Sequence, residues 1–105
     1  MHDLTAFQRD LLYVVAGLGG TRGTRIRDEL EGYYTDDVQA GRLYPNLDTL
    51  VEKGLVTKQP INDRANSYGP TRRCLRALED RDRWESQYVH RTDGDPETVS
   101  ATTDG

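Results

Sequence analysis

A chain of 105 residues, 34% hydrophobic and 30% charged, is long enough for one small domain with a single core. Its longest apolar run, Leu11 to Ala16, is too short to span a membrane. The first residues also lack the basic region followed by an apolar region that is typical of a signal peptide, so we expect a cytoplasmic protein. One cysteine and two separated histidines exclude an internal disulfide and a zinc site, and we expect no metal and no cofactor.

The net charge of −4 is distributed unevenly along the chain. Four acidic residues near the C-terminal end account for it, and residues 1–92 carry 14 charges of each sign. Because affinity for phosphate depends on local clusters of Lys and Arg, a neutral body does not exclude nucleic-acid binding. Arginine outnumbers lysine 12 to 2, a bias that fits either a GC-rich genome or a high-salt cytoplasm.

The first predicted helix spans residues 5–18. Thr5 and Gln8 stand three positions apart, which is the capping-box pattern at a helix start. Apolar residues then recur at helical spacing until Gly19 and Gly20, which end the helix.

Two further helices are predicted before the midpoint of the chain. Thr24 is expected to cap the second helix, which ends near Thr35. The third begins at about Gln39 and ends at Gly54, a residue type common after helix C-termini. The apolar face of this third helix consists of Leu43, Leu47, Leu50 and Val51.

A short two-stranded hairpin follows the third helix. Residues 55–59 include β-branched residues and have the alternating pattern of a strand. Residues 62–66 form a polar turn cluster, and Ser67 and Tyr68 are predicted to continue as a second strand toward Pro70. Thr71 then caps a fourth and longest helix, which continues to about Arg91. Residues 92–105 are rich in Gly, Pro, Thr, Ser and acids, so we expect a disordered acidic tail.

This order of elements predicts a mainly α (α+β) winged helix-turn-helix: three helices, a two-stranded wing and a long C-terminal helix. In that fold the third helix enters the DNA major groove, while the hairpin reaches the flanking backbone or the minor groove. We expect the DNA-binding domain to occupy residues 1–70, a dimerisation helix residues 71–91 and the tail residues 92–105.

One polar stripe on the third helix is expected to face away from the core. Arg42, Asn46 and Thr49 are the candidates for reading bases, since Arg can grip guanine and Asn can grip adenine with two hydrogen bonds. The alternative is that these side chains only face water, as on any amphipathic helix.

Basic residues gather at the second helix and around the hairpin, where they would flank the third helix. The alternative is again a charged surface that only interacts with solvent. The candidates for phosphate or wing contacts are Arg25, Tyr44, Lys53, Lys58, Arg64, Arg72 and Arg73.

Residues 41–55, GRLYPNLDTLVEKGL, resemble the signature of the PadR-like winged-helix transcriptional regulators, G-x-LYP-x-L-x-x-L-x-x-x-GL. The similarity extends over about residues 4–90 and is greatest to the short members from halophilic archaea. The resemblance implies a homodimeric DNA-binding regulator, often a repressor, whose C-terminal helix supplies most of the dimer contact. Pro70 stands where the family has an apolar strand residue, which predicts a short second wing strand. Only one helix follows the wing, so we do not expect an effector pocket built from further helices.

The fourth helix supports dimerisation independently of the resemblance. Ala77, Trp84 and Tyr88 fall on one side, apart from Leu75 and Leu78, which can cover the core. A second apolar face needs a partner, and two copies of one such patch would form a twofold dimer. The alternative is that Trp84 folds back onto its own domain.

Other signals in the sequence are weaker. The glycines of residues 17–23 lack the spacing of a phosphate-binding loop. Cys74 could be a redox switch activated by nearby arginines, but such a cysteine is more often a small buried residue. No pairing of a nucleophile with a base is visible, so we do not expect an enzyme. A winged helix that binds another protein instead of DNA remains the competing function.

Overall fold

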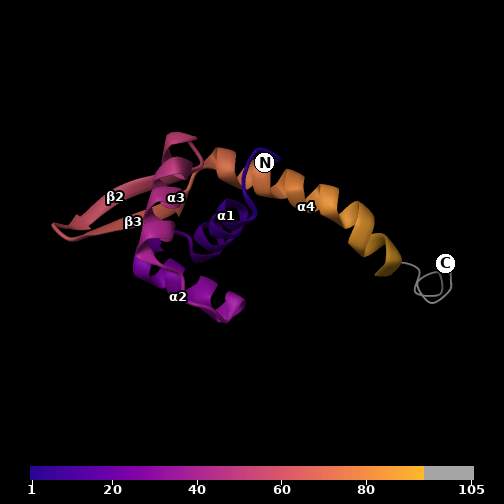
Figure 1. Cartoon of the computed structure of the whole chain (residues 1–105). Coiled ribbons are helices and arrows are strands. Elements are labelled where there is room, and N and C mark those ends of the chain that lie inside the picture. The colour runs from indigo at the N-terminus through magenta and orange to yellow at the C-terminus, as the bar shows by residue number, and fades with distance from the viewer. Residues whose placement is uncertain (94–105) are drawn as a thin grey trace.

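The structure is a computed structural model that describes residues 1–93, with side chains through residue 89. Figure 1 shows α3 across the middle of the molecule, with the wing extending to one side and α4 to the other. This is the predicted winged helix, with a third short strand added. In chain order the elements are α1 (Ala6–Leu18), β1 (Thr21–Arg22), α2 (Gly23–Tyr34), α3 (Ala40–Glu52), β2 (Val56–Asn62), β3 (Ala65–Pro70) and α4 (Arg72–Asp93).

Helix α1 begins and ends as its sequence predicts. The Thr5 hydroxyl oxygen accepts a hydrogen bond from the Gln8 backbone N–H, and Gln8 Oε1 accepts one from the Thr5 N–H, both at 3.1 Å. Gly19 ends the helix in the left-handed region, at φ 69°. The capping-box prediction is confirmed.

Helix α2 begins differently from the prediction. Its N-cap is Arg22, which makes no capping hydrogen bond through its side chain, so the expectation that Thr24 caps the helix is wrong. The physical reason is that Thr21 and Arg22 pair with β3, and the chain turns directly from this strand into the helix. At the other end, Thr35 adopts a left-handed conformation at φ 59°. The Glu31 carboxylate accepts a hydrogen bond from the Val38 N–H at 2.8 Å, which stabilises the turn into α3.

The sheet is larger than the predicted two-stranded wing. Its order is β1-β3-β2, and all pairs are antiparallel. Strand β3 extends to Pro70, so the expectation of a short second strand is wrong. Pro70 is tolerated because it stands at the end of β3, beyond the residues that pair with β1, and its missing N–H interrupts no bond there. Near the wing tip, Pro60 pairs with Asn66 and Asn62 with Ala65, which leaves Ile61 as the extra residue of a β-bulge.

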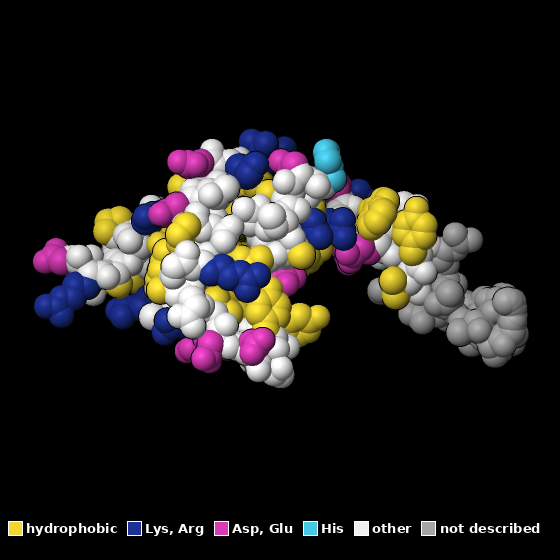
Figure 2. Space-filling view, in the orientation of Figure 1, with side chains coloured by type: hydrophobic (Ala, Val, Ile, Leu, Met, Phe, Trp, Pro, Cys, Tyr) yellow, Lys and Arg dark blue, Asp and Glu magenta, His cyan; other side chains and the backbone are white. Residues whose placement is uncertain are grey.

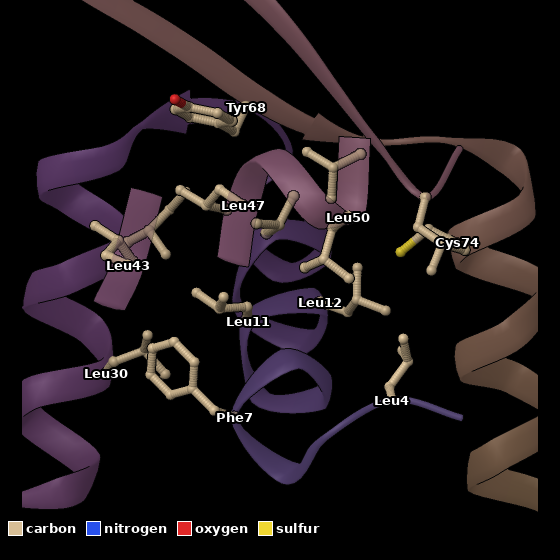
Figure 3. Close-up of a cluster of buried hydrophobic side chains, with 14 of the residues drawn as sticks. Leu4, Phe7, Leu11, Leu12, Leu30, Leu43, Leu47, Leu50, Tyr68 and Cys74 are labelled. Atoms are coloured by element: carbon tan, nitrogen blue, oxygen red, sulfur yellow. The ribbon is translucent and has the colours of Figure 1, made fainter. Parts of the chain in front are cut away.

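The core lies between α3, α1 and the base of the sheet (Figure 3). All three leucines of the predicted apolar face of α3 are fully buried, and Tyr68 closes the core from β3. Cys74 and Leu78 complete it from α4; Leu78 was expected to cover the core, whereas Leu75, expected to do the same, is 46% exposed. The fully buried large side chains are Leu11, Leu12, Val15, Ile26, Leu30, Leu43, Leu47, Leu50 and Cys74.

Helix α4 projects from the body (Figure 1) and carries exposed aromatic side chains. Trp84 is 50% exposed and Tyr88 60% exposed, and their rings meet edge to face with centroids 5.3 Å apart. Trp84 therefore does not fold back into the core of its own domain. Residues 92 and 93 of the expected tail belong to α4, and the rest of the tail lies outside the described residues.

Candidate nucleic-acid interface

An open hollow of about 710 Å³ lies where the first turn of α2, the outer side of α3 and the wing meet. These elements converge because β1 attaches the start of α2 to the middle strand of the sheet. Lys and Arg side chains lie along the wing and across the face of the molecule shown in Figure 2. The hollow is lined by Arg22, Gly23, Thr24, Tyr44, Asp48, Lys58, Asn62, Asp63, Arg64, Ala65, Asn66 and Tyr68.

An ion pair links α3 to the wing inside this hollow. Lys58 Nζ lies 3.0 Å from Asp48 Oδ1, and this hydrogen bond raises the pKa of Lys58. Burial raises the pKa of the neighbouring Tyr68, an effect that Lys58 opposes. Through this ion pair, Asp48 offsets one of the cations that would face DNA.

The predicted base-reading stripe lies on the flank of α3 beside α1, and not on its outermost side. Arg42 is exposed and places its guanidinium carbon 3.9 Å from the centre of the Phe7 ring. Asn46 is half-buried: its Nδ2 donates to the Arg42 carbonyl at 2.7 Å, and its Oδ1 accepts from Gln8 Nε2 at 3.0 Å. Thr49 donates its hydroxyl hydrogen bond to the Pro45 carbonyl at 3.0 Å.

The stripe is off the buried face, as expected, but it is not the part of α3 that lies furthest from the core. Because Leu43, Leu47 and Leu50 define the buried face, the opposite side of α3 carries other residues. Four of these are exposed: Gly41, Pro45, Asp48 and Glu52.

The predicted phosphate contacts fall into two groups. Tyr44, Lys58 and Arg64 line the hollow, and the exposed Arg25 lies on the first turn of α2, within 3.9 Å of Glu29. The other group lies at the opposite end of the wing. Lys53 and Arg73 line a second hollow of about 360 Å³ beside the N-terminal segment, and Arg72 begins α4.

Most residues that line the first hollow are absent from the sequence-based candidates, among them Arg22, Asp48 and Gly23. Arg22 belongs to a basic cluster visible in the sequence, but only its pairing with Ser67 places it beside the wing. Asp48 is not among the candidates because its position on the helix lies outside the polar stripe of Arg42, Asn46 and Thr49. Gly23 gave no signal, since a glycine next to a helix start is common in any sequence.

The structure also decides between the two interpretations of Cys74. The side chain is fully buried, and burial raises the pKa of the thiol to about 11. The reactive thiolate is therefore disfavoured at neutral pH despite the nearby arginines, which argues against a redox switch.

Residues 1–93 contain neither a membrane-spanning helix nor a cluster of metal ligands. None of the helices there is both long and apolar enough to cross a bilayer. Within the same residues, no cluster of three or more His, Cys, Asp or Glu side chains is arranged to hold a metal ion.

Comparisons with known proteins agree with this architecture. The structure of RosR from the halophilic archaeon H. salinarum, grown from NaBr, is 43% identical with a TM-score of 0.81, over 94% of this chain and 92% of that chain. A complex structure of hsRosR-S1 is 41% identical with a TM-score of 0.81, over 95% and 91% of the two chains. F93 from STIV, a winged-helix DNA-binding protein, is 17% identical with a TM-score of 0.69 over 82% and 94%, a likeness of fold alone.

No curated protein sequence matches the chain significantly. The model of the transcriptional regulator PadR-like family matches residues 11–80, which include α2, α3 and the wing. The chain therefore belongs to the PadR-like family of winged-helix, DNA-binding transcriptional regulators and is not an enzyme.

Proposed function

We propose that this regulator is a repressor that binds a pseudo-palindromic operator as a homodimer. The observation that carries the proposal is the convergence of α3, the first turn of α2 and the wing around one hollow with basic residues. A recognition helix placed in the major groove would bring the wing against the adjacent backbone or minor groove.

Arg42, Asn46 and Thr49 are the proposed base-reading residues. Arg42 is exposed, and leaving the Phe7 ring would cost only about 0.5–1 kcal/mol at a surface site, less than a bidentate contact to guanine supplies. Asn46 keeps one amide hydrogen and one oxygen lone pair beyond its two hydrogen bonds, which are the groups needed for adenine. Thr49 lies one turn further along α3.

Backbone contacts are proposed for the cations and the tyrosine around α3. Tyr44, Lys58 and Arg64 line the hollow beside the wing, and Arg25 extends this surface along α2. Lys53, Arg72 and Arg73 would contact phosphates further along the duplex. Such contacts position the protein without reading sequence, and each cation makes binding more salt-dependent.

The proposed dimer forms through α4. Trp84 and Tyr88 present two adjoining aromatic rings to solvent, and Figure 2 shows hydrophobic side chains gathered over this helix. Ala77 is half-buried nearer the body, where the contact would end. A twofold dimer would place the two copies of α3 about 34 Å apart, one turn of B-DNA, which is why we infer a pseudo-palindromic operator.

The test is a fluorescence-anisotropy titration against the DNA upstream of the protein's own gene and a scrambled duplex of equal length, across a salt series. We expect tight binding to the upstream DNA with a clear preference over the scramble. No binding to either duplex by a folded dimer would instead favour a winged helix that binds another protein.

Two variants separate base reading from backbone contact. Arg42→Ala should lower affinity mainly for the upstream duplex, because a guanine contact is lost only there. Arg64→Ala should weaken both duplexes alike and reduce the slope of log affinity against log salt by about one. Equal effects of Arg42→Ala on both duplexes would reject Arg42 as a base-reading residue.

A further inference from the structure

The ring of Tyr44 lies directly against the backbone of Gly23 at the start of α2. A Cβ atom at Gly23 would stand 2.6 Å from Cε1, 2.8 Å from the hydroxyl oxygen and 3.0 Å from Cζ of Tyr44. The first two distances are shorter than side chains tolerate, so the ring occupies the space that any residue other than glycine would need.

The backbone of Gly23 has little freedom to withdraw from this contact. The preceding residue, Arg22, is paired with Ser67 in the sheet. One turn further along α2, Ile26 is fully buried in the core. A side chain at position 23 would therefore displace the ring of Tyr44, whose outer end borders the open hollow, and not the helix.

We infer that Gly23 is a positioning residue for DNA binding, which seats Tyr44 so that its hydroxyl is held at the edge of the hollow beside the first turn of α2. The inference rests on the proposed role of Tyr44 as a contact to the DNA backbone. The ligand of this hydroxyl is a phosphate oxygen of the duplex, a group that tyrosine hydroxyls bind in protein–DNA interfaces.

A purely structural role for Gly23 predicts a different behaviour. If the glycine served only helix packing, its replacement would destabilise the fold. The atoms in conflict, however, belong to the outer end of one half-buried side chain, which can swing toward the hollow. Alanine is also a better helix former than glycine, which offsets part of the cost. DNA affinity should therefore change more than stability.

The first experiment compares Gly23→Ala with Gly32→Ala by anisotropy on the upstream and scrambled duplexes. Gly32 lies in the same helix and has open space around its Cβ position, so it is the matched control. We expect Gly23→Ala to weaken both duplexes about tenfold to a hundredfold, because the dimer loses one hydrogen bond in each subunit and each bond is worth about threefold to tenfold. The salt slope should not change, because no cation is lost. Gly32→Ala should stay within about twofold of wild type.

The second experiment tests whether the effect acts through Tyr44. Tyr44→Phe keeps the ring and removes the hydroxyl, so it should reproduce the loss of Gly23→Ala even if the glycine variant folds poorly. In a Tyr44→Ala background, adding Gly23→Ala should cause no further loss.

Three results would overturn the inference: wild-type affinity in Gly23→Ala, wild-type affinity in Tyr44→Phe, or an undiminished effect of Gly23→Ala in the Tyr44→Ala background. Failure of the proposed function itself can be recognised with the wild-type protein alone. If folded wild type binds neither duplex, the proposed function is rejected, and the role of Gly23 in DNA binding falls with it.

Discussion

Single residues of α1 hold the recognition helix in place. Gln8 completes the capping box of α1 through its Oε1 and donates from Nε2 to Asn46 of α3. Phe7, on the same turn, packs in the core and lies under the guanidinium of Arg42. The orientation of the proposed base-reading flank thus depends on two residues of α1 that are not themselves proposed to contact DNA.

A half-buried tyrosine hydrogen bond makes the free energy of unfolding depend on pH in the alkaline range. Tyr34 donates its hydroxyl hydrogen bond to Asp10 Oδ2 at 2.5 Å. Burial, together with this bond, raises the pKa of Tyr34 from 10 to about 12. The unfolded chain therefore loses the tyrosine proton first, and the free energy of unfolding should fall as pH rises from 10 to 12, with the full contribution present below pH 10.

Urea unfolding at pH 8 and at pH 11 measures this effect. Tyr34→Phe should lose less stability between the two pH values than wild type does, because the variant has no proton to lose at this site. Tyr33→Phe is the control, since Tyr33 is 80% exposed. A pH dependence that is the same in wild type and Tyr34→Phe would show that Tyr34 does not cause it.

At the scale of elements, the wing and α3 form one surface in which charges are partly balanced. The ion pair between Asp48 and Lys58 joins the outer side of α3 to β2. Surface pairs of this kind contribute little to stability, because solvent screens them. If this surface binds DNA as proposed, Asp48 would both occupy Lys58 and repel phosphate.

Asp48→Asn should therefore increase affinity for the upstream and scrambled duplexes alike. Releasing Lys58 for phosphate should also steepen the salt slope by about one. Glu79→Gln, which neutralises an exposed acid on α4, is the control for net charge and should change affinity much less. Unchanged binding by Asp48→Asn would place this ion pair outside the DNA interface.

At the scale of the whole molecule, α4 both completes the core and projects beyond it. Cys74 and Leu78 are buried against the body, whereas Trp84 and Tyr88 further along the helix are exposed. Arg81 covers part of the Trp84 ring, with its guanidinium carbon 4.9 Å from the ring centre. Aromatic side chains left this exposed are typical of interfaces.

Trp84→Ala should convert the proposed dimer to a monomer in sedimentation analysis, because the largest apolar side chain of the contact is removed. Tyr33→Ala removes another exposed aromatic side chain, at the end of α2, and should leave the dimer intact. A Trp84→Ala protein that sediments as wild type does would reject this interface.

The sequence by itself determined the order of the helices, the wing and the buried face of α3. These features arise from neighbouring residues: the Thr5–Gln8 capping box, Gly19 after α1, and the helical spacing of leucines that became the core. The LYP signature also indicated the PadR-like family, and the match of the family model to residues 11–80 confirms this.

Only the tertiary structure decided how the surface around α3 is arranged. Periodicity defines a face relative to the core, but it does not say which flank meets α1 and which meets the wing, so the position of the Arg42 stripe beside α1 could not be predicted. Strand β1, with two residues, has no periodicity to detect and exists because β3 pairs with it. The contact of Gly23 with Tyr44 joins residues 21 positions apart, and such contacts depend on how the elements pack.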